Sequence, residues 1–118
     1  MLLVADVGDA AYYYSERLGF EVRRYVANPT HYAYASRDDC HLHFACFKDA
    51  RPRPNSEAAP PDMFDVYVYV DDVQALHEEL VGRGAEILHA PTEMAYGTRE
   101  FRVRDPDGYI LAFGKLRE

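Results

Sequence analysis

A few polar side chains stand out because their types and spacing suit chemistry. His41 and His43 are two residues apart in an apolar stretch, and Glu100 and Arg102 have the same spacing further along. Residues two apart in a β-strand point to the same face, so we expect each pair to share one face. A carboxylate can orient an imidazole, so general acid–base work would pair His43 with Asp65 or Glu100.

Other familiar catalytic arrangements are missing from the sequence. Cys40 adjoins His41, but consecutive strand residues face opposite sides of a sheet, so this pair does not converge for nucleophilic catalysis. The sequence contains no GxSxG nucleophile elbow, no Walker phosphate loop and no GxGxxG dinucleotide motif. These absences argue against hydrolase, nucleotide-binding and dinucleotide-binding functions.

The composition is that of one acidic globular domain. The chain has 118 residues, 48% of them hydrophobic and 28% charged, with a formal net charge of −7. This acidic field repels phosphate backbones, and no basic cluster offsets it, so we expect no nucleic-acid partner. No apolar run approaches the roughly 18 residues that cross a bilayer, and no export signal precedes the first helix. We expect a cytoplasmic protein with no membrane contact, in which Cys40 and Cys46 are reduced.

The two halves of the chain repeat one pattern. Residues 4–7 read VADV and residues 70–73 read VDDV. Each of these segments precedes a helical pattern and then three short strand patterns. A segment that holds four of the seven prolines joins the halves and is typical of an extended linker. We predict a single α+β domain over 1–118, made of a β-α-β-β-β module at 1–47, a linker at 48–63 and a second module at 64–118.

Turn and cap residues give the expected bounds of the elements. Helices are expected at about 9–18 and 72–83, with Asp71 and Gln74 at capping-box spacing before the second. A glycine follows each helix, where it accepts a left-handed backbone. At least one ring of the tyrosine triplet 12–14 is expected to point inward. The strands that follow the helices are expected near residues 21–26, 32–36, 40–47, 86–89, 99–104 and 109–114.

Alternation along the strands separates a core face from a second face. The apolar set that we assign to the core is Leu42, Phe44, Val66, Val68, Val70, Phe101 and Val103. The opposite set is His41, His43, Asp65, Tyr67, Tyr69, Glu100 and Arg102. A solvated outer face would show the same alternation in any one strand. The ten tyrosines favour a ligand wall instead, because an aromatic ring with a hydroxyl tip suits a binding concavity.

These motifs resemble the glyoxalase/bleomycin-resistance/dioxygenase (vicinal-oxygen-chelate) superfamily over essentially the whole chain. The stretches HYAYASRDDCHLHF (31–44) and YGTREFRVRDPDG (96–108) look most like those of bleomycin-resistance proteins. The resemblance implies tandem βαβββ modules that form a curved mixed sheet around a central cup. It also implies a homodimer with ligand sites between the subunits. Members include metal-dependent lyases, dioxygenases, thiol transferases that act on fosfomycin, and metal-free proteins that sequester an antibiotic.

The resemblance also indicates where a metal ion would be held, on the first and last strand of each half. The position in the first strand of the first half falls ahead of Met1, and its counterpart in the second half is Asp65, where histidine is usual. The last-strand positions are His43 and Ala112, and alanine cannot ligate. Glu100 is an unorthodox further donor, and a ligand upstream of Met1 is another alternative. We expect neither a metal nor a cofactor.

We therefore predict a metal-independent protein that binds an antibiotic or another aromatic or cationic small molecule. Tyr96 would stack on the ligand, since it occupies the place before Gly97 where resistance proteins carry an aromatic residue. Tyr32, Tyr67 and Tyr69 would line the walls of the site. Asp65 and Glu100 would meet positive groups of the ligand, and Arg102 would pair with Glu100 or with a ligand carbonyl. The predicted ligand-binding residues are Tyr32, His41, His43, Asp65, Tyr67, Tyr69, Tyr96, Glu100 and Arg102.

Two alternatives stay open. One is a metal-dependent lyase or dioxygenase of the same superfamily. The other is a protein whose cup is closed by side chains and which acts through its dimer surface. The sequence has no tryptophan, which weakens the case for bleomycin itself as the ligand.

Overall fold

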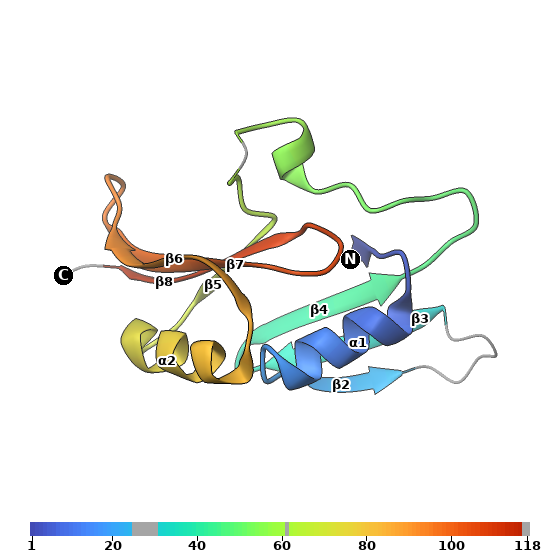
Figure 1. Cartoon of the computed structure of the whole chain (residues 1–118), viewed down its shortest axis with the longest axis horizontal. Coiled ribbons are helices and arrows are strands. Elements are labelled where there is room, and N and C mark those ends of the chain that lie inside the picture. Colours follow the sequence, from blue (N-terminus) through green and yellow to red (C-terminus); the bar gives the residue numbers. More distant parts are fainter. Residues whose placement is uncertain (25–30, 61, 117–118) are drawn as a thin grey trace. The chain divides into compact units, whose positions relative to one another are not determined.

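Each half of the chain folds as a β-α-β-β-β module. The computed structural model describes residues 1–24, 31–60 and 62–116 (Figure 1). Contacts divide the chain into two compact units, Met1–Arg53 and Pro54–Glu118. None of the described helices is long and apolar enough to cross a membrane.

The first unit is one helix packed on a four-stranded sheet. Its strands are ordered β1-β4-β3-β2. Strand β1 runs parallel to β4, and the other neighbours are antiparallel. The elements are β1 (Leu2–Leu3), α1 (Val7–Glu16), β2 (Glu21–Arg24), β3 (Tyr32–Arg37) and β4 (Cys40–Ala45).

Aromatic packing joins α1 to its sheet. The ring of Tyr14 is fully buried, with its centroid 4.6 Å from that of Phe44 and 5.5 Å from that of Phe20. Ala33 and Ala35 on β3 are also fully buried, and these small residues let the helix approach the sheet. The prediction that one ring of the tyrosine triplet points inward is confirmed by Tyr14.

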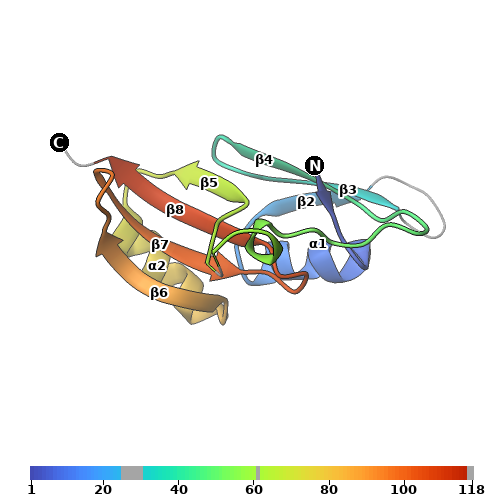
Figure 2. The same ribbon diagram turned by 90° about the horizontal axis from the view of Figure 1, so that it is seen from above.

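The second unit repeats this arrangement. Its strands are ordered β5-β8-β7-β6, with β5 parallel to β8 and the other neighbours antiparallel, as Figure 2 shows. A short 3-10 helix, η1, precedes them. The elements are η1 (Asn55–Glu57), β5 (Val66–Tyr69), α2 (Val73–Arg83), β6 (Glu86–Glu93), β7 (Thr98–Arg104) and β8 (Ile110–Leu116).

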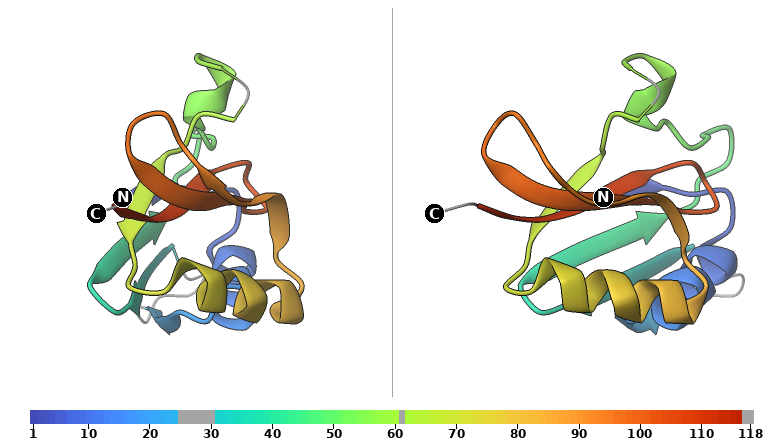
Figure 3. Two further views of the ribbon diagram at one scale, coloured as in Figure 1. Left: turned by 90° about the vertical axis from the view of Figure 1, so that its left-hand side faces the viewer. Right: turned by 60° about the vertical axis from the view of Figure 1, so that its left-hand side comes forward.

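Helix α2 covers one face of this sheet (Figure 3). It buries Leu76 and Leu80, and on the sheet Phe101 stacks on Phe113 with ring centroids 5.4 Å apart. Phe101 and Val103 are fully buried, so the predicted core face of β7 is confirmed. The face opposite α2 is therefore the one that carries the polar set.

The fold class is confirmed, and four local predictions need correction. The side chain that caps α2 is Asp72, which accepts a hydrogen bond from the Ala75 amide at 3.0 Å, and not Asp71. Helix α1 begins at Val7, ahead of the predicted residue 9, because Asp6 caps it. The predicted linker is not extended throughout, since it contains η1. The strands form two separate four-stranded sheets instead of one.

Two predictions cannot be compared with the fold in this way. Residues 25 and 26 of a predicted strand lie outside the described residues. The central cup stays a prediction.

Candidate functional site

The face of the second sheet opposite α2 brings together several of the predicted residues. Strand β8 lies between β5 and β7, so side chains from both neighbours flank its small residues. Ala112 is the register partner of Tyr67 and Arg102, and Gly114 is the partner of Tyr69 and Glu100. We call this surface the Glu100 face; it consists of Tyr67, Tyr69, Glu100, Arg102, Ala112 and Gly114.

Glu100 is fully buried and accepts four side-chain hydrogen bonds. Its Oε1 accepts from the hydroxyls of Thr98 at 3.1 Å and Tyr67 at 3.2 Å. The hydroxyl of Tyr96 also donates to Oε1. Its Oε2 accepts from Nε of Arg102 at 2.9 Å. A buried carboxylate is tolerated only when its charge is paired and its oxygens are satisfied, and this set of donors achieves both.

Arg102 connects β7 to the segment that precedes β5. Its Nη1 donates to the carbonyl oxygen of Asp62 at 2.6 Å, and its Nη2 donates to the hydroxyl of Tyr96 at 3.2 Å. The guanidinium carbon lies 5.2 Å from the centroid of the Phe64 ring, within cation–π range. Only 8% of the side chain is exposed. The guanidinium is thus held on Glu100, on the chain before β5 and on two aromatic residues.

The side chains of Glu100, Arg102, Thr98, Tyr67 and Tyr96 form one hydrogen-bonded network, which we call the Glu100 network. Its contacts shift the pKa values of several members. Burial alone would raise the pKa of Glu100, but hydrogen bonds from Tyr96, Arg102 and Thr98 and the charge of Arg102 together lower it. Desolvation, opposed in part by a hydrogen bond with Thr98 and reinforced by the charge of Glu100, raises the pKa of Tyr67 to about 12. Desolvation and the bond to Glu100 also raise the pKa of Tyr96. At neutral pH the site therefore holds an ionised carboxylate and neutral tyrosine donors.

Several aromatic side chains lie beside this network or belong to it. We call Phe64, Tyr67, Tyr69 and Tyr96 the aromatic wall. The rings of Phe64 and Tyr67 have centroids 5.3 Å apart, and those of Tyr67 and Tyr69 are 5.0 Å apart. Tyr69 is 68% exposed and Tyr96 is 55% exposed. These two rings are the accessible part of the wall, whereas the charged groups lie beneath.

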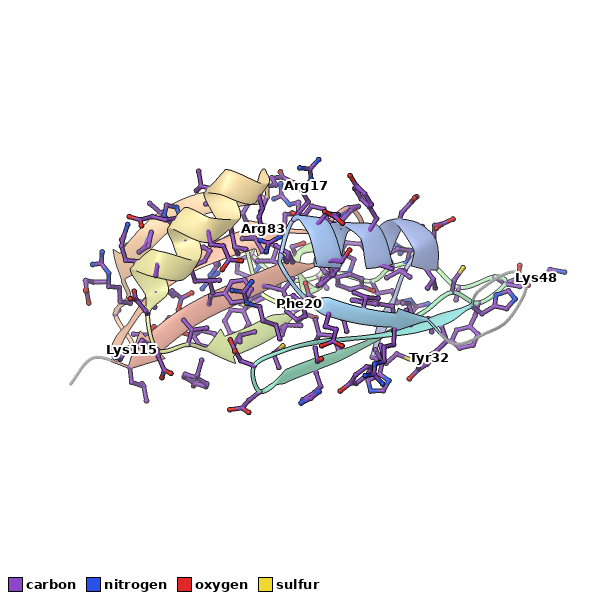
Figure 4. The ribbon with its side chains drawn as sticks, turned by 90° about the horizontal axis from the view of Figure 1, so that it is seen from below. Arg17, Phe20, Tyr32, Lys48, Arg83 and Lys115 are labelled. Carbon is purple, nitrogen blue, oxygen red and sulfur yellow. The ribbon has the colours of Figure 1, made fainter. Side chains whose placement is uncertain are left out.

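The first unit has its own row of rings on the face opposite α1. Tyr32 and Tyr34 on β3 lie beside His41 and His43 on β4, and Figure 4 marks Tyr32 on the side of the sheet away from α1. The hydroxyl of Tyr32 is hydrogen-bonded to Nδ1 of His43, and that of Tyr34 to Nδ1 of His41. The Tyr34 ring also lies edge-on to His43, with centroids 5.1 Å apart. The four rings thus alternate between tyrosine and histidine.

Asp65 does not join the Glu100 network. It lies just before β5, and its Oδ1 accepts the Asn55 amide at 2.7 Å while its Oδ2 accepts the Ile110 amide at 2.9 Å. The carboxylate therefore anchors η1 to the start of β8.

The donors of the second module do not fit a metal ion. Ala112 has no ligating atom, both oxygens of Asp65 accept backbone amides, and Glu100 is paired with Arg102. In the part of the chain that the structure describes, no three His, Cys, Asp or Glu side chains come together in a group that could hold a metal.

Some members of the site were not predicted from the sequence. Thr98 and Tyr34 lie two residues from the predicted Glu100 and Tyr32, so alternation would have found them. Asp62 and Phe64 fall in or beside the predicted linker, where no periodic signal exists.

A cavity of about 310 Å³ lies elsewhere in the second unit, at the start of α2. None of the predicted site residues lines it. Its lining is Asp71, Asp72, Val73, Gln74, Arg99, Lys115 and Leu116.

Comparison with known proteins places this geometry in context. The family model described as Glyoxalase/Bleomycin resistance protein/Dioxygenase superfamily matches residues 1–113. No curated protein matches the sequence. A bleomycin-binding protein solved in complex with bleomycin is similar with a TM-score of 0.74 and 23% identity, over 98% of this chain and 94% of that one.

Two further solved structures share the fold at 19% identity. TioX from Micromonospora sp. ML1 has a TM-score of 0.74, over 98% of this chain and 94% of that chain. A glyoxalase/bleomycin resistance protein/dioxygenase from Nocardioides has a TM-score of 0.71, over 99% of this chain and 80% of that one. At these identities the likeness shows the fold alone.

Proposed function

Because the chain belongs to the glyoxalase/bleomycin resistance protein/dioxygenase superfamily, we propose that it binds a small aromatic molecule without using a metal ion. Antibiotics and aromatic metabolites, neutral or cationic, are the ligand class. One solved relative by fold is a bleomycin-binding protein, which supports binding as the general activity of this chain.

The observation that carries the proposal is the exposed pair Tyr69 and Tyr96 above a satisfied polar network. The side chain of Tyr69 is 68% exposed and that of Tyr96 is 55% exposed. Hydrogen bonds of the Tyr96 hydroxyl with Glu100 and Arg102 hold the Tyr96 ring in place. A ring held in place loses little conformational entropy when a planar ligand stacks on it. Stacking and cation–π contacts contribute about 0.5–2 kcal/mol each, so several together give useful affinity.

Charge favours a cationic or neutral ligand over an anionic one. Glu100 and Arg102 neutralise each other, and the carboxylate of Asp62, 3.8 Å from Nη1 of Arg102, is 67% exposed. The net charge of the whole chain is −7. An anionic ligand would therefore approach against the field of the protein.

The row of rings in the first unit is proposed to contribute to the same function. His41 is exposed and Tyr32 and His43 are half-buried in this row, and hydrogen bonds from tyrosine hydroxyls hold the imidazoles in place. A homodimer as the binding form belongs to the same proposal, and size-exclusion chromatography with light scattering tests it.

The proposed function is tested by thermal shift with a panel of ligands. The panel contains bleomycin, planar aromatic cations, their neutral analogues and aromatic carboxylates, because a ligand that binds only the native state raises the melting temperature. We expect at least one planar aromatic compound, cationic or neutral, to raise the melting temperature of the wild type. The carboxylates are expected to give the smallest shifts.

Two alanine variants make the test specific to the site. Tyr69→Ala removes the most exposed ring of the wall, and Tyr12→Ala removes a ring of α1 that is 57% exposed. The ligand shift should be lost in Tyr69→Ala and retained in Tyr12→Ala. If no compound shifts the wild type, or if both variants respond alike, the proposed function is wrong.

A further inference from the structure

Gly114 occupies a position where glycine is unfavourable unless something requires it. It lies within β8, the strand between β5 and β7. Its φ is not among the positive values of the described glycines, so backbone conformation does not explain it. Glycine in a strand costs conformational entropy and packs nothing, and it often marks the close approach of another group.

The close approach at Gly114 is made by Tyr67. A Cβ atom on Gly114 would lie 2.1 Å from the hydroxyl oxygen of Tyr67 and 2.9 Å from its Cζ. It would also lie 3.1 Å from Cβ of Glu100. The first two distances are shorter than real Cβ contacts, so any larger residue would require the tyrosine ring to move.

The direction of the Tyr67 side chain explains why a side chain at position 114 would interfere with it. Tyr67 pairs in register with Ala112, whereas Glu100 pairs with Gly114, so the phenol crosses β8 diagonally to reach the carboxylate. The bare backbone of Gly114 is the surface that it crosses. The bond from Tyr67 to Oε1 of Glu100, at 3.2 Å, is the result.

We propose that Gly114 is a positioning residue, whose missing side chain lets Tyr67 lie across β8 and donate to Glu100. Tyr67 in turn lies against Tyr69, with ring centroids 5.0 Å apart. Gly114 thereby determines where the Tyr67 ring lies against the exposed ring of Tyr69. This consequence for ligand contact rests on the proposed function, whereas the placement of Tyr67 does not.

The first test is the ionisation of Tyr67 in Gly114→Ala. In the wild type, burial and the neighbouring carboxylate keep the Tyr67 hydroxyl protonated at pH values between the ordinary 10.0 and about 12. The alanine methyl would displace the ring toward solvent, so the pKa of Tyr67 should fall toward its ordinary value. Ring-labelled tyrosine NMR, assigned with Tyr67→Phe, follows this one residue.

A matched control is Gly82→Ala. Gly82 lies in α2, and a Cβ atom there would meet nothing within 4 Å. This variant should leave the Tyr67 titration unchanged. If Gly114→Ala also leaves it unchanged, Gly114 does not position Tyr67 and the inference is overturned.

The second test is a double-mutant cycle in melting temperature. Tyr67→Phe should lower the melting temperature of the wild type but have much less effect in Gly114→Ala, where the hydroxyl has already left Glu100. Equal effects in the two backgrounds would contradict the inference. If Gly114→Ala does not fold, Gly114→Ala with Tyr67→Leu should fold, because the leucine has no atoms at the position of the phenol tip. Failure of that double variant to fold would overturn the inference as well.

Ligand shifts separate this inference from the proposed function. Should the titration and the cycle behave as expected while no panel compound shifts the wild type, Gly114 positions Tyr67 and the proposed function fails. If a compound shifts the wild type but Gly114→Ala changes neither the titration nor the cycle, binding stands and the inference fails.

Discussion

Nε of Arg102 donates to Oε2 of Glu100 at 2.9 Å, two residues away on the same strand. Both side chains are buried, with 8% and 0% exposed. Adjacent same-face residues on one strand thus form an ion pair, and Tyr67, Tyr96 and Asp62 supply further partners from outside the strand. The pair occupies the face on which the site was predicted.

Replacing Arg102 should be among the most destabilising changes in the second unit. Arg102→Met leaves the Glu100 carboxylate buried without a counter-charge, which costs about 3–5 kcal/mol in the free energy of unfolding. Urea denaturation measures this loss. The double change Glu100→Leu with Arg102→Met should cost less than Arg102→Met alone, because it removes the uncompensated charge as well. A double variant that is less stable than the single one would contradict this account.

Acid should destabilise the fold through Glu100. The pKa of this carboxyl is lower in the folded protein than its ordinary value of 4.5. Its contribution to stability is therefore fully present above 4.5 and is lost as the pH falls through the lower, folded value. Urea midpoints measured across this range should decline with acid in the wild type. The same decline should be shallower in Glu100→Gln, and identical slopes would argue against a lowered pKa.

Alkali should destabilise the fold through Tyr67. Its pKa is raised from 10.0 to about 12 in the folded protein, so the folded state holds the proton after the unfolded state has lost it. This contribution is intact below pH 10 and is lost as the pH rises from 10 to about 12. The difference in unfolding free energy between the wild type and Tyr67→Phe should therefore change with pH only above pH 10. A constant difference would show that Tyr67 has no raised pKa.

Removing the hydroxyl of Tyr96 should weaken the network while leaving its exposed ring in place. Tyr96→Phe deprives Glu100 of one donor and Arg102 of one acceptor, at a cost of about 1–2 kcal/mol in unfolding free energy. Tyr69→Phe is the matched control, because no hydrogen bond of the Tyr69 hydroxyl occurs among the described residues. Its unfolding free energy should stay close to that of the wild type. Equal losses in both variants would not be compatible with the network.

Asp65 should hold η1 in place. Asp65→Ala leaves the amides of Asn55 and Ile110 without their acceptor, so residues 55–57 should become more sensitive to limited proteolysis. Asp65→Asn keeps one carbonyl oxygen as an acceptor and should be cleaved at an intermediate rate. Cleavage of the alanine variant at the wild-type rate would show that the carboxylate is not the anchor.

Local patterns in the sequence predicted the repeated β-α-β-β-β order of elements, but not the division of the strands into two sheets. Alternation placed Phe101 and Val103 under α2 and Glu100 and Arg102 on the other face, because a strand has a period of two residues. The cap of α2 was misplaced by one residue because Asp71 and Asp72 are adjacent and equally suitable as caps. The choice between them depends on the backbone angles at the end of β5, which composition does not encode.

The sequence predicted that Glu100, Arg102 and Tyr67 share one face, but it did not predict most of their contacts. The sequence predicted that Arg102 would pair with Glu100 or with a ligand, and the structure shows the pairing with Glu100. Asp65 was grouped with Tyr67 by alternation, but it lies before β5 and its carboxylate accepts backbone amides. The contacts of Asp62 and Phe64 with Arg102 depend on the residues just before β5, where no periodic pattern in the sequence predicts contacts. Ligand contact by the predicted residues stays a prediction.

Calorimetric titration before and after metal removal tests the central claim most directly. The titrant is whichever panel compound gives the largest melting shift, and the protein is compared before and after dialysis against a strong chelator. We predict the same affinity in both samples, because the wall of Tyr69 and Tyr96 binds the ligand without an ion. Loss of binding after chelation, with recovery on adding back one divalent metal, would contradict the account.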